Sequence, residues 1–417
     1  MTGAPFFRSR WVEVPDGVTD AGRGAHGLPR GFRAAGVAAG LKPSGARDLG
    51  LLVCDAPDAT SAGRFTRSGV LAAPVVLTKE RTRLDALRAV VVNSGNANAA
   101  TGRRGLDEAA KVQGAGAMAA GVHVDQVALA STGVIGVQLD GSLLVRGLAR
   151  AAAELRADGD GDLAAAMMTT DAFEKRAVLD VELSAGTVRL CAQAKGAGMI
   201  QPSFATMLCF VQTDARLEAA TADLLLGVCV KRSFDRISVD GQLSTNDTVL
   251  LLASGAAGVA VEPESDDELR FGQALDALLR QLALDIVRDG EGAARIGRVV
   301  VRGGHAAGVE RAARAIANSP LVKAALHGGD PNWGRIAQAL GMALVDTAPL
   351  AFDIAIEGVQ VASAGSALPC DEPALARAVD RDEVEYVVGL PGGGHETEVF
   401  FSDLSHTYVT VNADYTT

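Results

Sequence analysis

The segment of this sequence with the clearest chemical potential is a glycine-rich turn that leads to a threonine. The run from Lys195 to Leu208 holds glycines at its second and fourth positions and places Ala205 directly before Thr206. Glycine reaches backbone conformations that are closed to other residues, and the small Ala205 leaves the following peptide bond sterically open. The Thr206 hydroxyl oxygen is therefore a candidate to attack the Ala205 carbonyl carbon, so that the amide shifts to an ester and hydrolysis releases a chain that starts at Thr206.

Such a cleavage would place a free α-amine beside the Thr206 hydroxyl. An α-amine has a reference pKa of about 8, so a useful fraction is neutral near pH 7 and acts as general base for the hydroxyl. This self-contained pair is the basis of catalysis by an N-terminal threonine. Threonine at the start of a strand and glycine in a turn are also ordinary structural features, so the spacing alone leaves a purely structural interpretation open.

Short apolar runs bounded by Gly, Pro or Asp predict the buried strands that must position this segment. Two of these runs flank positions 195–208, so we expect Thr206 to lie in a β-rich centre. The predicted strands cover residues 49–54, 75–78, 89–92, 177–183, 187–193 and 207–213.

Apolar residues at helical spacing predict helices on both sides of that centre. A capping box, Ser265-x-x-Glu268, opens one of them, and the Asp-Gly-Asp-Gly run at 158–161 predicts a loop. Beyond Asp346 predicted strands dominate. The other predicted helices cover residues 106–120, 142–155, 217–234, 306–317 and 332–343.

Composition limits the classes of protein to which the chain can belong. Its 417 residues are 48% hydrophobic, with 48 glycines and 4% aromatics, which favours a core of Ala, Val and Leu in a mixed fold with many tight turns. The net charge of −11, with no basic stripe, makes nucleic acid an unfavourable partner. No stretch has the length of a membrane span or the apolar core of a signal peptide, so we expect a cytoplasmic protein.

Cysteine and histidine give no sign of a metal centre. The five cysteines are scattered without a C-x-x-C pair, and the six histidines have no partner at metal-ligand spacing. We therefore expect buried thiols, no disulfide framework and no metal site. The Gly114-x-Gly116-x-x-Ala119 run fits a dinucleotide fingerprint only formally, because it lies within a predicted helix and does not follow a strand.

Ordered motifs along residues 31 to 417 resemble those of the ornithine acetyltransferase family, also called the bifunctional glutamate N-acetyltransferase family of arginine biosynthesis. The run from Lys195 to Leu208 is similar to the signature around that family's self-cleavage site. Many motifs in the same order are far more specific than any single one. The other similar segments are Gly31 to Gly40, Asn93 to Asn98, Ser131 to Gly136, Met168 to Asp171, Ser244 to Thr248, Asp289 to Ala293, Asp330 to Arg335 and Asn412 to Thr417.

The resemblance implies a role for particular residues. Thr206 would be the acetyl acceptor, and cleavage after Ala205 would give chains 1–205 and 206–417. The resemblance also places an oxyanion hole at Thr132 and Gly133, where each donor contributes roughly 3–4 kcal/mol to stabilising the developing charge. The implied substrate contacts are Thr169, Lys195, Thr206, Glu291, Asn412 and Thr417.

These residue types suit an N-acetylated amino acid. Lys195 and Thr169 can bind an α-carboxylate, and Glu291 can accept hydrogen bonds from the ammonium of ornithine. Simpler structural interpretations of the implied site residues also stay open: a strand-to-helix turn at 131–136, solvated charges at Lys195 and Glu291, and a frayed terminus at 412–417.

The fold implied by the resemblance is α+β, with layered mixed sheets flanked by helices, like that of ornithine acetyltransferases and related self-cleaved aminopeptidases. We expect a weakly ordered arm at 1–30, a main α/β catalytic domain at 31–345 and a smaller α/β C-terminal domain at 346–417. The two cleaved chains would associate, as an α2β2 heterotetramer in the family's manner.

The function implied is a ping-pong transfer of acetyl from N2-acetylornithine to glutamate through acetyl-Thr206, with no cofactor. Three alternatives stay open: a self-cleaved aminopeptidase or amidohydrolase, a non-catalytic relative that binds amino acids, and a paralogue that acts in secondary metabolism. Whether acetyl-CoA is also a donor is likewise open. The chain departs from the family pattern at Ala100, where Cys is frequent, and at Gln242-Leu243, where Asp-Thr is usual, which bears on substrate range more than on mechanism.

Overall fold

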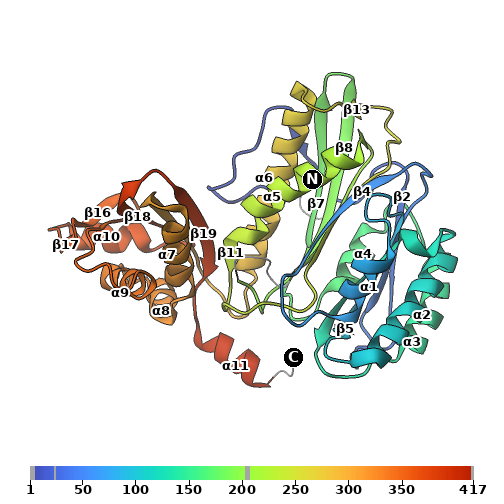
Figure 1. Cartoon of the computed structure of the whole chain (residues 1–417), viewed down its shortest axis with the longest axis horizontal. Coiled ribbons are helices and arrows are strands. Elements are labelled where there is room, and N and C mark those ends of the chain that lie inside the picture. Colours follow the sequence, from blue (N-terminus) through green and yellow to red (C-terminus); the bar gives the residue numbers. More distant parts are fainter. Residues whose placement is uncertain (1–4, 23–24, 202–206, 415–417) are drawn as a thin grey trace.

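The computed structural model describes residues 5–22, 25–201 and 207–414, so Ala205, Thr206 and Thr417 lie outside the described residues. Two stacked sheets form the centre, helices cover their outer faces, and a further sheet with its own helices lies to one side (Figure 1). This arrangement confirms the expected α+β fold of layered mixed sheets flanked by helices.

A six-stranded mixed sheet holds the two strands that flank the expected cleavage site. Lys195, the last residue of one strand, pairs with Leu208, the first residue of its antiparallel neighbour, and Leu208 pairs in parallel with Thr248. The two ends of the glycine-rich run therefore lie side by side, at the end of β8 and the start of β9, within the sheet. In spatial order the strands are β1 (Val18–Asp20), β7 (Lys175–Leu183), β8 (Gly186–Lys195), β9 (Leu208–Thr213), β12 (Thr248–Ala253) and β4 (Thr60–Phe65).

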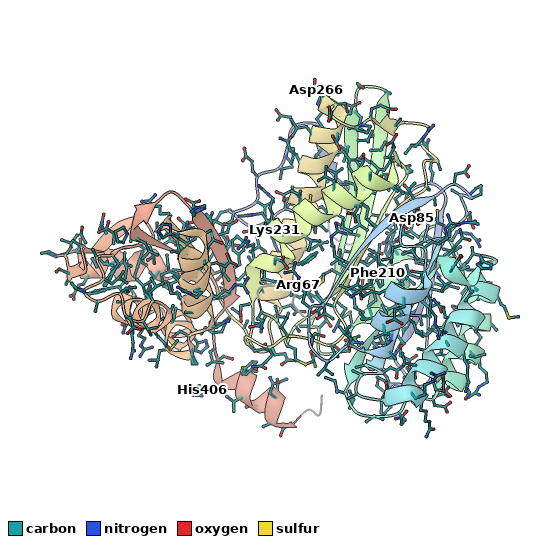
Figure 2. All side chains as sticks on the ribbon, in the orientation of Figure 1. Arg67, Asp85, Phe210, Lys231, Asp266 and His406 are labelled. Atoms are coloured by element: carbon teal, nitrogen blue, oxygen red, sulfur yellow. The ribbon has the colours of Figure 1, made fainter. Side chains whose placement is uncertain are left out.

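A four-stranded sheet packs face to face on the six-stranded one. Along β9, Leu208 and Phe210 point into the space between the sheets, whereas Cys209 and Val211 point to the opposite face, as the two-residue period of a strand requires. Both faces are apolar because both are covered, and Phe210, labelled in Figure 2, is fully buried. The strands of this sheet, in spatial order, are β2 (Phe32–Val37), β3 (Leu49–Cys54), β5 (Ala89–Asn96) and β6 (Val127–Val134).

Helices close both outer faces of this pair of sheets. Helices α5 (Ala219–Arg232) and α6 (Asp266–Arg288) bury apolar side chains against the six-stranded sheet, and the Ser265 hydroxyl caps α6 by accepting from the Glu268 amide at 3.1 Å. This confirms the predicted helix start. The four-stranded sheet is covered by α1 (Ala73–Arg81), α2 (Gly102–Ala120) and α3 (Gly141–Ala153), and α4 (Asp160–Met167) lies between the sheets.

The C-terminal unit is a seven-stranded sheet with four helices and its own apolar core. That core starts with Val299 and Val301 on β14, which pairs in parallel with β18, so the expected boundary at 345/346 falls inside the unit. Its strands, in spatial order, are β11 (Ile237–Ser238), β19 (Glu396–Ser402), β14 (Ile296–Gly304), β18 (Glu383–Gly393), β15 (Asp353–Ile356), β16 (Val359–Ser363) and β17 (Ser366–Ala367). Its helices are α7 (Ala306–Asn318), α8 (Pro320–Gly328), α9 (Trp333–Ala343) and α10 (Glu372–Val379).

The remaining elements are short. A two-stranded parallel pair joins β10 (Arg216–Leu217) to β13 (Ala260–Val261), and α11 (His406–Asp414) ends the described chain. Single-turn helices occupy Val124–Gln126 and Phe234–Arg236. In the part of the chain that the structure describes, no helix has both the length and the apolar character needed to cross a membrane.

Two local predictions are wrong, and one helix between residues 306 and 343 was missed. Residues 75–78 lie in α1 rather than in a strand, because Pro74 occupies the first turn of a helix, where its missing N–H costs nothing. The expected loop at 158–161 ends within α4, whose first turn carries Asp160 and Asp162 where the helix dipole favours acidic residues. Helix α8 was not predicted.

The N-terminal arm is packed rather than weakly ordered where it is described. Phe6 is buried in the core beside the six-stranded sheet, and β1 pairs with β7. The Arg8 guanidinium also donates to the Asp285 carboxylate on α6 at 2.9 Å. The Arg8–Asp285 ion pair joins residues 277 positions apart in sequence, so the Gly- and Pro-rich composition of the arm gives no indication of it.

Candidate active site

Lys195 brings three of the predicted site residues together. The side chain ends β8 and is 3% exposed, and its ammonium donates to the Thr132 hydroxyl at 3.1 Å and to the Thr169 hydroxyl at 3.0 Å. Thr132 lies near the end of β6, and Thr169 follows α4. One cation with two hydroxyls, largely removed from water, has the chemistry needed to bind a small anionic group such as a carboxylate.

Gly133 follows Thr132 at a position that only glycine can fill. Its φ is +129°, and a Cβ atom there would lie 2.4 Å from the Gly95 carbonyl carbon and 2.5 Å from the Asn96 amide nitrogen. Strands β5 and β6 change register at this point. The close approach of the two backbones fixes the end of β6, and with it the Thr132 side chain beside Lys195.

Burial and charge act in opposite directions on this lysine. Burial lowers the pKa of Lys195 from its ordinary value, while the carboxylate of Asp171, 3.9 Å from the ammonium, raises it. Burial would raise the pKa of Asp171, but the Lys195 and Lys175 charges outweigh that effect and hold the pKa well below its usual range. Asp171 is therefore a buried, ionised carboxylate next to the lysine.

Glu291 and Asn412 form a second hydrogen-bonded group of predicted site residues. The Glu291 carboxylate accepts from the Thr170 hydroxyl at 2.8 Å and from the Asn412 side-chain amide at 2.7 Å. The Glu291 backbone amide donates to the Ala197 carbonyl at 3.0 Å, and a Cβ atom at Gly198 would lie 3.0 Å from the Glu291 carboxylate. Glycine at this position thus leaves room for the carboxylate beside the run that follows Lys195.

The structure therefore brings together Thr132, Gly133, Thr169, Lys195, Glu291 and Asn412 from distant parts of the sequence. The predicted nucleophile itself, Thr206, lies outside the described residues, as do Ala205 and Thr417. The described residue nearest to it in sequence is Met207, which is buried and whose amide donates to Asp247 at 3.0 Å. Burial raises the pKa of Asp247 well above its ordinary value, despite that hydrogen bond.

Four charged residues near the site were not predicted as functional: Asp171, Lys175, Asp247 and Asp289. Asp171, Asp247 and Asp289 lie within the motifs that carry the resemblance, and this position in the sequence could have marked them as candidates. Lys175 lies outside those motifs, on β7, and its sequence neighbourhood gives no indication that its side chain is fully buried.

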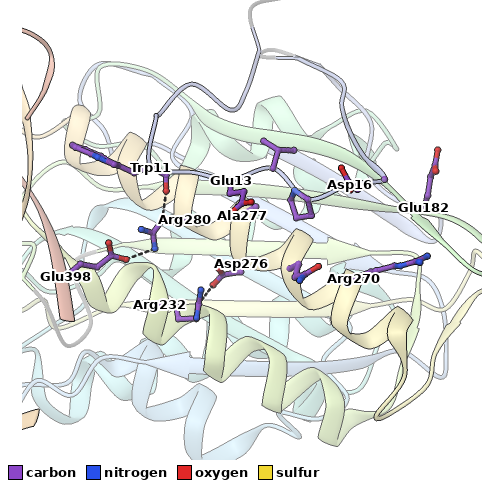
Figure 3. Close-up of a pocket in the computed structure, with 14 residues that line it drawn as sticks. Trp11, Glu13, Asp16, Glu182, Arg232, Arg270, Asp276, Ala277, Arg280 and Glu398 are labelled. Atoms are coloured by element: carbon purple, nitrogen blue, oxygen red, sulfur yellow. Dashed lines mark hydrogen bonds and ion pairs between the residues drawn. The ribbon is translucent and has the colours of Figure 1, made fainter. Parts of the chain in front are cut away.

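A groove elsewhere in the molecule has a volume of about 910 Å³ and contains none of the predicted site residues (Figure 3). The N-terminal arm around Trp11 forms one side, and Arg232, Arg270 and Arg280 with Asp276 and Glu398 form the other.

No three His, Cys, Asp or Glu side chains converge as metal ligands anywhere in residues 5–22, 25–201 and 207–414. Four of the five cysteines are buried, Cys370 is half-buried, and all five are free thiols.

Known proteins are similar to this chain over almost its whole length. The arginine biosynthesis bifunctional protein ArgJ of Symbiobacterium thermophilum is 44% identical over 93% of this chain and 98% of its own length. The protein of that name from Parasynechococcus marenigrum is 41% identical over 99% of this chain and 98% of its own. The crystal structure of a Bacillus halodurans protein of that name is 34% identical, covers 49% of this chain and 98% of the crystallised chain, and has a TM-score of 0.47. The ArgJ family model matches residues 33–417, and the chain belongs to the ArgJ family.

Proposed function

We propose that this protein is a glutamate N-acetyltransferase of arginine biosynthesis, which transfers acetyl from N2-acetylornithine to glutamate through an acetyl-Thr206 intermediate. The observation that carries the proposal is the buried Lys195 ammonium between the Thr132 and Thr169 hydroxyls, on the strand whose paired neighbour begins two residues after Thr206. The relatives named as arginine biosynthesis bifunctional proteins support it.

In the first half-reaction the Thr206 hydroxyl oxygen attacks the acetyl carbonyl carbon of N2-acetylornithine. The neutral α-amine of Thr206 takes the hydroxyl proton, and Thr132 with Gly133 stabilises the oxyanion. The acetyl C–N bond then breaks, and the departing ornithine nitrogen receives the proton. Acetyl is left as an ester on Thr206.

In the second half-reaction the neutral amine of glutamate attacks the ester carbonyl carbon. The acetyl C–O bond to Thr206 then breaks, and the α-amine of Thr206 passes the proton lost by glutamate to the Thr206 oxygen, which restores the hydroxyl. Lys195 and Thr169 bind the α-carboxylate that both substrates share, while Glu291, oriented by Asn412, accepts from the side-chain ammonium of ornithine. The chain's own residues supply the nucleophile, the base and the oxyanion donors, so the mechanism uses no cofactor.

Cleavage would divide the six-stranded sheet between chains 1–205 and 206–417. Strand β8 of the first chain pairs with β9 of the second, and β4 of the first pairs with β12 of the second. Two strand pairs and a shared apolar core would therefore keep the fragments together after the peptide bond is broken. We further propose that two such cleaved units form an α2β2 heterotetramer and that the enzyme acts in the cytoplasm.

Assays with N2-acetylornithine test the proposal. Purified protein should release ornithine and form N-acetylglutamate in equal amounts when glutamate is present, and Thr206→Ala should abolish both. Acetate release that is indifferent to glutamate would contradict a transferase and indicate a hydrolase. Because the relatives are called bifunctional, the same assay with acetyl-CoA as donor measures whether a second acetyl source is used.

A further inference from the structure

A fully buried lysine, Lys175, lies behind the proposed substrate contacts. Its ammonium forms ion pairs with Asp171 at 2.8 Å and with Asp289 at 2.5 Å, and neither carboxylate side chain is more than 3% exposed. The ammonium also lies 4.9 Å from the centre of the Phe173 ring. Lys175 is too far from solvent to act as a surface charge, and nothing in the proposed mechanism uses it.

The two carboxylates hold the backbone segments that carry the substrate contacts. Asp171 accepts from the Gly196 amide at 2.7 Å and from the Thr169 amide at 3.0 Å, so it fixes the residue that follows Lys195 as well as Thr169 itself. Asp289, two positions before Glu291, accepts from the Ala172 amide at 3.0 Å. The cluster of Asp171, Lys175 and Asp289 thus ties three chain segments to one buried cation.

Asp171 is also the carboxylate that acts most strongly on Lys195. Asp247 and Glu291 also favour its charged form, whereas Lys175 disfavours it by like charge. Besides burial, the like charge of Lys195 lowers the pKa of Lys42, and because this repulsion is mutual, Lys42 also disfavours the charged form of Lys195. Without Asp171, the burial of Lys195 would be opposed only by the weaker acidic contributions. The lysine would then lose its proton at a lower pH.

We propose that Asp171, anchored by Lys175, is a positioning residue that keeps Lys195 protonated and oriented toward the substrate carboxylate. The proposal rests on the proposed function, because it takes Lys195 as the group that binds that carboxylate. The decline of kcat/KM at high pH should then follow the loss of the Lys195 proton, which the charge of Asp171 opposes.

The test is the pH profile of kcat/KM for N2-acetylornithine in Asp171→Asn, which keeps the side-chain shape and removes the charge. The alkaline limb should move to lower pH by about one unit or more, since an opposite charge at this distance shifts a pKa by about 1–3 units. KM should rise more than kcat falls, because a carboxylate contact is lost in ground and transition states alike. Asp171→Glu, which restores the charge, should move the limb back.

Asp160→Asn is the matched control. The Asp160 side chain is fully buried, like that of Asp171; it accepts from the Gly27 amide at 3.1 Å and pairs with Arg176 at 2.5 Å, but it touches none of the proposed substrate contacts. It should lower the melting temperature and leave the alkaline limb in place. An unmoved limb in folded Asp171→Asn, or an equal movement in Asp160→Asn, would overturn the proposal.

Lys42→Met tests the same electrostatics if Asp171→Asn does not fold. Lys42 is half-buried, and removing its like charge should move the alkaline limb to higher pH. An unchanged limb would overturn the proposal, because Lys195 would then not control it. Failure of the proposed function is distinguishable, since it would show in the unaltered protein as missing cleavage at Thr206 or missing acetyl transfer.

Discussion

Two regions of this molecule are rich in charged side chains, and they differ in what surrounds those charges. Around Lys195, cations and carboxylates lie inside the protein, within hydrogen-bond distance of one another and of backbone amides. In the groove beneath the N-terminal arm, ion pairs such as Arg232 with Asp276 line a space of about 910 Å³ but remain partly in water (Figure 3). We therefore expect function to follow the desolvation of charged groups rather than the volume of a groove.

The largest expected effect is on stability. Lys175→Met leaves two buried carboxylates without their cation and should lower the free energy of unfolding by about 3–5 kcal/mol. Arg232→Met breaks a groove ion pair whose arginine side chain is 63% exposed, and should cost no more than about 1 kcal/mol. Urea unfolding of both variants measures the difference. Equal losses would remove the distinction between the two regions.

The next effect is on substrate binding. Lys195→Met removes a cation that two hydroxyls hold in place, and should raise KM for N2-acetylornithine by about 10- to 100-fold, as expected for a hydrogen bond to a charged group. Arg270→Met in the groove is the control and should leave KM unchanged. Steady-state kinetics at fixed pH compares them, and a raised KM for Arg270→Met would make the groove part of the substrate site.

A smaller effect is expected where a side chain has room to adjust. Gly198→Ala places a methyl group 3.0 Å from the Glu291 carboxylate, which must shift away from its Thr170 and Asn412 partners. KM for N2-acetylornithine should rise roughly two- to fivefold, the equivalent of about 0.5–1 kcal/mol. At Gly114, in α2, an added methyl group meets open space, so Gly114→Ala should leave KM at its original value.

Much of this architecture could be predicted from local pattern. The apolar run at 49–54 coincides with β3, and the Ser265 capping box opens α6, because burial and capping leave a trace within a few residues of sequence. The strand predicted at 75–78 is wrong because the Val-Val-Leu-Thr run has strand propensity, whereas Pro74 in the first turn and the packing of α1 favour a helix.

The candidate site was predictable only in part, and for a different reason. Family motifs indicated Lys195 and Glu291, but not that Lys175 pairs with Asp289, from which it is separated by 114 positions. Such pairing is a property of the folded chain. A lysine on a strand looks the same in sequence whether it is solvated or fully buried between two carboxylates.

Intact-mass measurement of the purified protein before and after incubation with N2-acetylornithine tests whether Thr206 is released by cleavage and carries the acetyl group. We expect two masses, those of chains 1–205 and 206–417, and the gain of one acetyl group on the second chain that glutamate then removes. A single chain of 417 residues, or an acetyl group carried on any residue other than Thr206, would contradict it.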